Sequence, residues 1–243
     1  MHASQGRLCF FVSGREDSQS LLYFAYSLIE EISIVTSERS STFGPTALTM
    51  SQPNDGSLPS GLPNGRIHIT GHNDAGLAEL HSSKDGEWTW FPSRNVGFNV
   101  AYTTSKFPVD LNNNADITSH AQTMASGTLG LVQPGGTVCR IVDFGPQGSP
   151  LMHRTQSLDY GIVLEGEVEM ELDDGSVTLL KRGDIAVQRG TNHAWRNPSP
   201  TEWTRMLFVL QECEPVVIGT NKLKEDLGDA TDEIPGSGHP GDN

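Results

Sequence analysis

Two of the eight histidines, His153 and His193, stand in matching contexts that could support chemistry. His153 follows a turn over residues 145–150 (GPQGSP), and His193 follows a turn over residues 189–192 (RGTN). If the two neighbouring strands bring both side chains into one cavity, the imidazoles would act together. Because imidazole titrates close to neutral pH, such a pair could serve as general acid and general base.

Polar side chains recur at alternate positions after His153. Strand side chains alternate between two faces, so a regular strand would place Thr155, Ser157 and Asp159 on the face of His153. A face of this composition is too polar for a packed core and is typical of a wet or liganded cavity. If Asp159 hydrogen-bonds one imidazole, it would fix the tautomer and raise the pKa of that ring.

Other side chains near these histidines, Thr155 among them, could bind a substrate. Gln188, at the end of the strand-like run 184–188, could point inward and orient the substrate. Arg140, in the run TVCRIVDF, could bind an anionic substrate, although a single arginine is more often paired at a surface or across an interface. Trp195 could contact the substrate, although packing in the core or at the rim is the commoner role.

The elements that would position these residues are short strands. From residue 66 to residue 219, strand-like runs alternate with turns that contain glycine or proline, and helical periodicity is nearly absent. The tripeptide Asp173-Asp174-Gly175 between two runs is a strong hairpin signal. This pattern predicts an all-β sandwich or barrel, and the lack of an internal repeat predicts one barrel rather than two.

The segments beside the predicted barrel differ from it in composition. Residues 18–35 have apolar positions close to one helical face, which predicts a helix in an N-terminal extension that ends in a Ser/Pro/Gly-rich linker. The polar segment 103–120 is expected to form a long loop over the barrel. The predicted domains are the extension and linker over 1–65, the barrel over 66–218 and an acidic, disordered tail over 219–243.

The charge balance disfavours several classes of partner. The 243-residue chain has 30 acidic and 16 basic residues, a formal net charge of -14, and no segment concentrates Lys and Arg. Nucleic acid and anionic membranes require clustered positive charge, so neither is an expected partner. Three cysteines without metal-like spacing, and residues 1–15 without a secretory signal, predict a cytoplasmic protein.

The residues around both histidines resemble the two motifs of the cupin superfamily, in particular its small conserved-barrel members. The first motif has a glycine, two histidines, a glutamate and a second glycine, and these places are taken here by Gly148, His153, Thr155, Asp159 and Gly166. The places of the second motif are taken by Gly183, Asp184, Gln188, Gly190, His193 and Asn197. The resemblance implies a single double-stranded β-helix, or jelly-roll barrel, and small cupins commonly form homodimers that cover open sheet edges. It says little about the reaction, because this fold hosts many functions.

The resemblance also implies where a metal could bind. The usual ligands are the two histidines and the glutamate of the first motif and the histidine of the second, but Thr155 and Asp159 replace two of these here. The remaining set of His153, Asp159 and His193 has the composition of a two-histidine, one-carboxylate triad, which suits iron and other first-row metals (Fe, Mn, Ni or Zn). Aspartate is one methylene shorter than glutamate, and threonine is a poor ligand. We therefore favour a metal-free polar pocket that holds no cofactor.

Three functions follow from these patterns. Fungal relatives of this kind belong to the tailoring enzymes of aromatic polyketide pathways, so the resemblance favours an enzyme of secondary metabolism. The favoured activity is that of a lyase or isomerase, in which His153 and His193 catalyse isomerisation, dehydration or decarboxylation of a small molecule. The alternatives are a metal-dependent oxygenase that uses the triad with Asp159, and a small-molecule binder without catalytic activity. Metal analysis of the purified protein distinguishes the lyase or isomerase from the oxygenase.

Overall fold

The computed structural model describes residues 57–239 of the chain. The chain divides after Thr49, and all described residues belong to the second part, Met50–Asn243. The helix predicted over residues 18–35 lies outside the described residues and stays a prediction.

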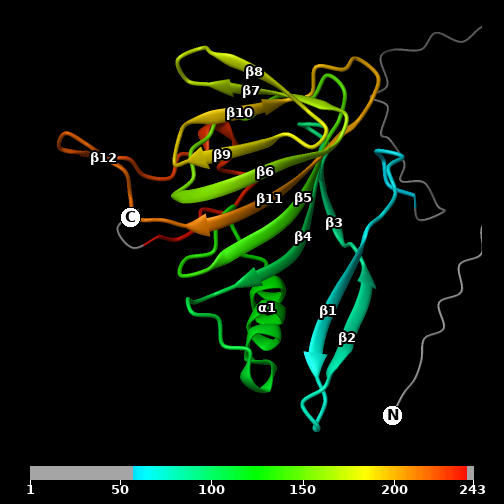
Figure 1. The fold of residues 1–243 in the computed structure, drawn as a ribbon. Helices are drawn as coiled ribbons and strands as arrows, with labels where there is room; N and C mark the ends of the chain where they lie inside the picture. Colours follow the sequence, from blue (N-terminus) through cyan, green and yellow to red (C-terminus); the bar gives the residue numbers. More distant parts are fainter. Residues whose placement is uncertain (1–56, 240–243) are drawn as a thin grey trace, which may run out of the picture. The chain divides into compact units, whose positions relative to one another are not determined.

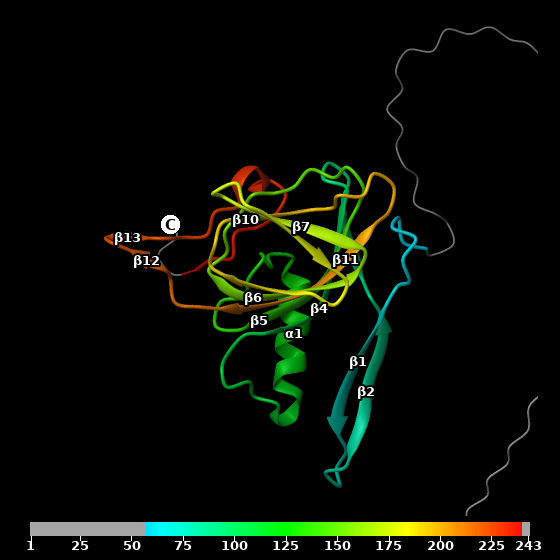
Figure 2. The same ribbon diagram turned by 45° about the horizontal axis from the view of Figure 1, so that its top comes forward.

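Two antiparallel sheets form the body of the described chain (Figure 1). The larger sheet contains, in spatial order, β3 (Trp88–Phe91), β4 (Val96–Thr104), β5 (Thr137–Phe144), β11 (Thr204–Glu212), β6 (Ser157–Glu165) and β9 (Ile185–Arg189). The smaller sheet contains β10 (His193–Arg196), β7 (Glu167–Leu172) and β8 (Val177–Lys181). Figure 2 shows β7 and β10 in a layer that faces β4, β5, β6 and β11. The prediction of an all-β fold is confirmed.

Two separate hairpins complete the strand set of residues 57–239. The first pairs β1 (Arg66–His72) with β2 (Ala78–Asp85), and the second pairs β12 (Val217–Ile218) with β13 (Asn221–Lys222). The first twenty residues of the predicted barrel, 66–85, therefore form a two-stranded ribbon rather than part of either larger sheet.

The core lies between the two sheets because alternate side chains of each strand point inward. Along β5, Val138 and Val142 are buried, and along β11 Met206 and Phe208 are buried. Val168 of β7 meets them from the smaller sheet. Burying such a side chain stabilises the fold by about 1.5–3 kcal/mol. This repeated gain fixes which face of each strand points into the core.

The pairing register determines which polar side chains reach the interior. On β11, Phe208 pairs with Arg140 of β5 on one side and with Gly161 of β6 on the other. Glycine is needed at the second place, since a Cβ on Gly161 would lie 2.9 Å from the Phe208 ring. Further along β11, Leu210 pairs with Asp159 of β6. Arg140 and Asp159 therefore enter the interior from strands on opposite sides of β11.

The predicted hairpin at Asp173-Asp174-Gly175 is confirmed and joins β7 to β8. The backbone N–H of Leu172 donates to the carbonyl oxygen of Ser176 at 2.9 Å. The backbone N–H of Gly175 donates to the carbonyl oxygen of Leu172, also at 2.9 Å. Gly175 has a φ of 82°, a left-handed conformation that glycine adopts without strain.

The prediction of a loop throughout residues 103–120 is wrong. The segment enters a 3-10 turn, η1 (Asn112–Asn114), and then a helix, α1 (Ala115–Ser126). The hydroxyl of Tyr102 on β4 donates to the Asp116 carboxylate at 2.6 Å and ties the helix to the sheet. No residue of α1 is buried, so the sequence carries little of the apolar periodicity that marks a helix. Within residues 57–239, no helix is long and apolar enough to cross a membrane.

The C-terminal segment, predicted to be disordered from residue 219, is ordered and packed through residue 239. Its few apolar side chains explain the difference, because Leu227, Ala230 and Ile234 are all buried in the core. A short 3-10 turn, η2 (Gly228–Ala230), lies among them. Three well-placed apolar groups thus anchor a segment whose average composition is polar.

Polar contacts hold the same C-terminal segment to the barrel. Arg154 and Asp226 form a β-bridge with reciprocal backbone hydrogen bonds of 2.8 Å. The side chain of Arg94 bonds to Asp229 at 2.8 Å and to Glu233 at 3.1 Å. Two of the acidic residues in the segment that was predicted to be a solvated tail, Asp229 and Glu233, therefore form ion pairs with a buried arginine.

Candidate active site

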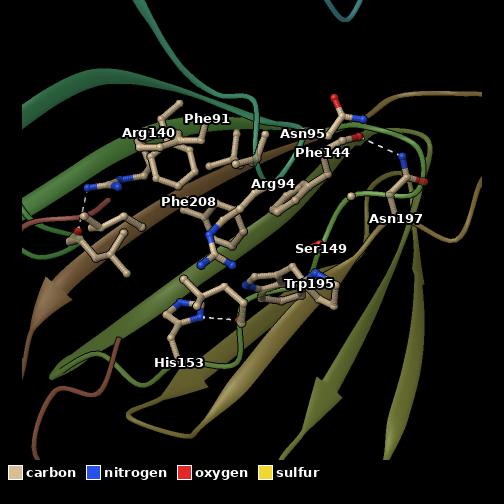
Figure 3. Close-up of a pocket in the computed structure, with 18 of the residues that line it drawn as sticks. Phe91, Arg94, Asn95, Arg140, Phe144, Ser149, His153, Trp195, Asn197 and Phe208 are labelled. Atoms are coloured by element: carbon tan, nitrogen blue, oxygen red, sulfur yellow. Dashed lines mark hydrogen bonds between the residues drawn. The ribbon is translucent and has the colours of Figure 1, made fainter. Parts of the chain in front are cut away.

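A pocket opens between the two sheets, and side chains from both line it (Figure 3). Much of its wall is aromatic, and the rings belong to Phe91, Phe98, Phe144, Trp195 and Phe208. Its polar lining includes two arginines, two histidines, an aspartate, two asparagines and a serine, namely Arg94, Arg140, His153, His193, Asp159, Asn95, Asn197 and Ser149. An apolar cavity with a few converging polar groups is typical of a small-molecule site.

His153 and His193 lie side by side in this pocket. They form an isolated antiparallel β-bridge in which each backbone N–H donates to the carbonyl oxygen of the other at 2.9 Å. Their ring centroids are 4.5 Å apart. His193 opens β10 as expected, whereas the strand expected to begin at His153 starts only at Ser157. The bridge, rather than a regular strand, places His153.

The backbone fixes the same tautomer in both imidazoles. Nδ1 of His153 lies 3.0 Å from the carbonyl oxygen of Leu151, and Nδ1 of His193 lies 3.0 Å from that of Thr191. A carbonyl oxygen only accepts, so each Nδ1 carries the hydrogen and donates it. Each Nε2 of the neutral ring therefore has a free lone pair, and no group among residues 57–239 makes a hydrogen bond to either atom. Both rings can thus accept a proton at Nε2.

Both histidines are neutral at neutral pH. Burial lowers the pKa of His193 from its ordinary 6.5 to about 3, and repulsion from His153 adds to the effect. Burial also lowers the pKa of His153, and the nearby Arg140 cation acts in the same direction. The charge of Glu225 acts to raise the pKa of His153, but burial has the larger effect. Both rings are free to accept a proton, but the lowered pKa makes each a weaker base than free imidazole, and the acid must be sought elsewhere.

Asp159 is buried beside the pocket but does not hold a histidine. Its carboxylate accepts hydrogen bonds from the hydroxyls of Ser157 and Thr155, the latter at 3.3 Å. The Ser157 hydroxyl also lies 2.8 Å from that of Thr155. The predicted shared face of these three side chains is present, and it forms a closed cluster. The expected hydrogen bond from Asp159 to an imidazole is absent among the described residues.

Burial changes the acidity of Asp159. It raises the pKa of the carboxyl from 3.8 to about 6, although the bonds from Ser157 and Thr155 and the charge of Arg140 all act in the other direction. A carboxyl with this pKa is partly protonated slightly below neutral pH. Asp159 is therefore the group of the pocket best suited to give up a proton.

The other predicted substrate-binding residues lie in different places. Arg140 and Trp195 line the pocket, and Trp195 packs edge-on against His193 with ring centroids 5.4 Å apart. Thr155 and Gln188 are buried but are not part of the pocket wall. The amide of Gln188 bonds to Thr191 and to the sulfur of Met170, so it braces the turn before β10.

Sequence reasoning missed Arg94, which lines the pocket from the turn between β3 and β4 (Figure 3). Its carboxylate partner Asp229 lies 135 residues further along the chain. Ile234, from the same C-terminal segment, also lines the pocket. No local pattern marks either residue, because their contacts join distant parts of the chain.

The side chains do not assemble the metal triad that the motifs implied. Among residues 57–239, no three His, Cys, Asp or Glu side chains are placed to hold one metal ion together. His153 and His193 offer two bare nitrogens, but the Asp159 carboxylate is engaged by two hydroxyls. Two imidazoles without a third ligand are an incomplete set for a first-row metal.

Comparisons with known proteins identify the family. Residues 140–210, which include both histidines and Asp159, match the family model of the Cupin domain. Phomopsin biosynthesis cluster protein D of Diaporthe leptostromiformis is 43% identical over 175 residues, which cover 70% of this chain and 90% of the relative. This chain belongs to the cupin family.

Other relatives of this cupin are also fungal proteins. Oryzines biosynthesis cluster protein J of Aspergillus oryzae is 39% identical over 177 residues, covering 72% of this cupin and 98% of the relative. The cupin-domain-containing oxidoreductase fogC of Aspergillus ruber is 38% identical over 164 residues, covering 66% of this cupin and 79% of the relative. The relatives are thus proteins of fungal biosynthesis clusters and cupins named as oxidoreductases.

Solved structures similar to this cupin include a cupin-2 domain protein from Rhodospirillum rubrum. The two chains are 17% identical, with a TM-score of 0.33, and the alignment covers 57% of this cupin and 69% of the other chain.

Proposed function

We propose that this cupin is an enzyme of secondary metabolism that moves a proton on a small organic molecule and so acts as an isomerase, dehydratase or decarboxylase. The observation that carries the proposal is the pair of neutral imidazoles, His153 and His193, with bare Nε2 atoms in an apolar pocket. A positioned base of this kind contributes about 10²–10⁴-fold in rate.

The proposed first step is the removal of a proton from a carbon next to a substrate carbonyl. Nε2 of one histidine forms the new N–H bond, and the electron pair of the broken C–H bond forms an enolate. With ring centroids 4.5 Å apart, a second positive charge is disfavoured, so one ring takes the proton and the other stays neutral. The resulting imidazolium and enolate neutralise each other in the pocket.

The second step decides the reaction. Return of the proton to a different carbon gives isomerisation, and its transfer to a departing hydroxyl releases water. In a decarboxylation, the substrate loses carbon dioxide directly, and the electron pair left on carbon takes a proton from the Asp159 carboxyl, whose pKa of about 6 suits it to this role. None of these routes needs an oxidant or a reductant.

The relatives support a role in secondary metabolism. Two of them carry the names of phomopsin and oryzines biosynthesis cluster proteins, and the second is covered over 98% of its length. The aromatic wall of the pocket fits a substrate with an aromatic or otherwise apolar body. An aromatic polyketide substrate is consistent with this wall and stays a prediction.

The experiment that tests the proposal begins with deletion of the gene in the organism that encodes it. Complementation with wild type should restore the end product, whereas His153→Gln and His193→Gln should leave an accumulated precursor. That precursor is then incubated with purified protein in deuterium oxide. Deuterium incorporation, or loss of water or carbon dioxide, supports proton-transfer chemistry. Binding of the precursor without any change in it contradicts the proposal and favours a binding protein.

An oxidoreductase is the second candidate, because several relatives carry that name. Under this reading, the bare Nε2 atoms of His153 and His193 would hold a metal ion, which would supply the redox chemistry. If our proton-transfer proposal holds instead, we expect substoichiometric, easily removed metal in the purified protein. One tightly held Fe, Mn, Ni or Zn per chain that is lost in His193→Ala, together with uptake of labelled dioxygen into the product, would establish this candidate instead.

A further inference from the structure

Arg140 is a fully buried cation at one end of the pocket (Figure 3). Its side chain is 4% exposed. Nη2 donates to the carbonyl oxygens of Gly130 at 2.8 Å and Leu131 at 2.9 Å, and the guanidinium carbon lies 5.4 Å from the centre of the Phe98 ring. Burial lowers the pKa of Arg140 only to about 10, so the charge persists at neutral pH. The ion pair at the surface that is common for a single arginine is absent for Arg140 within the described chain.

The other buried arginines of residues 57–239 show what is missing at Arg140. Arg205 forms two bonds to the Asp143 carboxylate, at 2.6 Å and 2.7 Å. Arg94 is paired with two carboxylates of the C-terminal segment. Arg140 has no carboxylate oxygen within 4.0 Å among the described residues. Its Nε is buried and has no hydrogen-bond partner at all.

Asp159 does not supply the missing partner. It lines the same pocket and its charge acts on Arg140, but its oxygens accept the hydroxyl bonds of Ser157 and Thr155, and it forms no ion pair with Arg140. The two residues are separated by β11, since Arg140 pairs with Phe208 and Asp159 pairs with Leu210. Buried charges in proteins are normally paired, and an unpaired donor carries a desolvation cost of about 1–3 kcal/mol. Arg140 thus presents a charge to the pocket that no carboxylate of residues 57–239 neutralises in an ion pair.

We propose that Arg140 recognises the negative charge of the substrate, and that the substrate is a small carboxylic acid with an aromatic or apolar body. The inference rests on the proposed function only in placing the substrate in this pocket. Arginine suits the role because its guanidinium is always charged and is rich in N–H donors. The phenyl and indole rings of the wall receive the apolar body, with Phe98 and Phe208 next to the guanidinium. His153 and His193 are neutral, and Arg94 is already paired with two carboxylates, so Arg140 is the principal attraction for the substrate carboxylate.

The test compares matched carboxylate and carboxamide ligands on the full-length protein. Benzoate and benzamide, phenylacetate and phenylacetamide, and cinnamate and cinnamamide have nearly the same shape within each pair and differ in that a charged carboxylate replaces a neutral amide. Isothermal titration calorimetry on wild type should give at least tenfold tighter binding for the carboxylate in at least one pair. Equal or weaker binding of every carboxylate overturns the inference without the use of any variant.

Variants then assign the preference to Arg140. Arg140→Gln should abolish the tenfold difference, whereas Arg140→Lys should keep part of it because the charge remains. The matched control is Arg196→Gln, since Arg196 is an exposed residue that pairs with Glu169 at 2.8 Å outside the pocket. It should bind like wild type. If Arg140→Gln retains the preference for carboxylates, the inference fails. The binding preference tests the role of Arg140, and the deuterium-exchange assay tests the proposed proton transfer. Because the two are measured independently, failure of one proposal is distinguishable from failure of the other.

Discussion

His153 and His193 hold their rings by the same local arrangement, in which Nδ1–H of each donates at 3.0 Å to the carbonyl oxygen two residues earlier, Leu151 or Thr191. The reciprocal backbone bridge between the two residues then sets the rings beside each other. The backbone, rather than a carboxylate, therefore selects the tautomer. Asp159 makes no hydrogen bond to either ring, and both Nε2 atoms stay available to a substrate.

Replacement of either histidine should stop turnover without unfolding the protein. Glutamine keeps a hydrogen-bonding side chain but cannot accept a proton at this pH, so His153→Gln and His193→Gln should each lower the rate about 10²–10⁴-fold. The rate is measured by conversion of the accumulated precursor, with His81→Gln on the exposed β2 ribbon as control. Full activity in either variant would remove that histidine from the mechanism.

The stability of the protein should fall in acid because of His193. Its pKa drops from 6.5 to about 3 on folding, so between these values the unfolded chain binds a proton that the folded chain does not. The contribution of His193 to stability is therefore greatest above pH 6.5 and declines as the pH falls, by up to about 1.4 kcal/mol per pH unit for one proton. Asp159, whose pKa rises to about 6, acts in the opposite direction between about pH 4 and pH 6.

Urea denaturation at several pH values between 4 and 7.5 isolates the contribution of His193. His193→Gln should show a shallower decline than wild type on acidification, because the proton-binding difference has been removed. Parallel curves for His193→Gln and wild type would mean that His193 does not titrate as its burial implies.

Expression from Met50 should give a cooperatively folding protein. The chain divides after Thr49, and the described residues form a core between the two sheets. Thermal melting of the shortened and full-length proteins should agree within a few degrees. Aggregation of the shortened protein, or a large loss of melting temperature, would show that residues 1–49 pack on the barrel.

The C-terminal segment should contribute to stability despite its polar composition. Ile234 is 6% exposed and belongs to the core cluster, so Ile234→Ala should destabilise the protein by about 2–5 kcal/mol in chemical denaturation. Leu77→Ala is the control, since Leu77 is 66% exposed and its loss should cost less than about 0.5 kcal/mol. Similar effects of the two substitutions would contradict the packed position of the segment.

The protein should form a homodimer in which a second copy of the chain covers the edge strand β9. β9 is an edge strand, and its outward side chains Ile185 and Val187 are 61% and 50% exposed beside Tyr160, which is 41% exposed. Exposed apolar sheet edges are prone to association. Light scattering at micromolar concentration should give twice the mass of 26.3 kDa, and Ile185→Glu should shift it toward the monomer. A monomeric wild type would exclude the dimer.

The sequence by itself determined the features that depend on neighbouring residues. Period-two alternation predicted that Thr155, Ser157 and Asp159 share one face, and their hydroxyls and carboxylate do meet. The tripeptide Asp173-Asp174-Gly175 predicted its hairpin because a tight turn needs a left-handed residue at Gly175. Such signals are local, so they survive in the one-dimensional chain.

Only the tertiary structure decided how charges and packing are shared between distant segments. The order of β5, β11 and β6 separates Arg140 from Asp159 and leaves the arginine without a carboxylate. Likewise, Ile234 and the ion pairs of Arg94 bring the C-terminal segment onto the barrel, although its composition predicted disorder. The free energy of a buried charge or of an isolated apolar residue depends on what lies across the fold. Spacing along the chain does not contain that information.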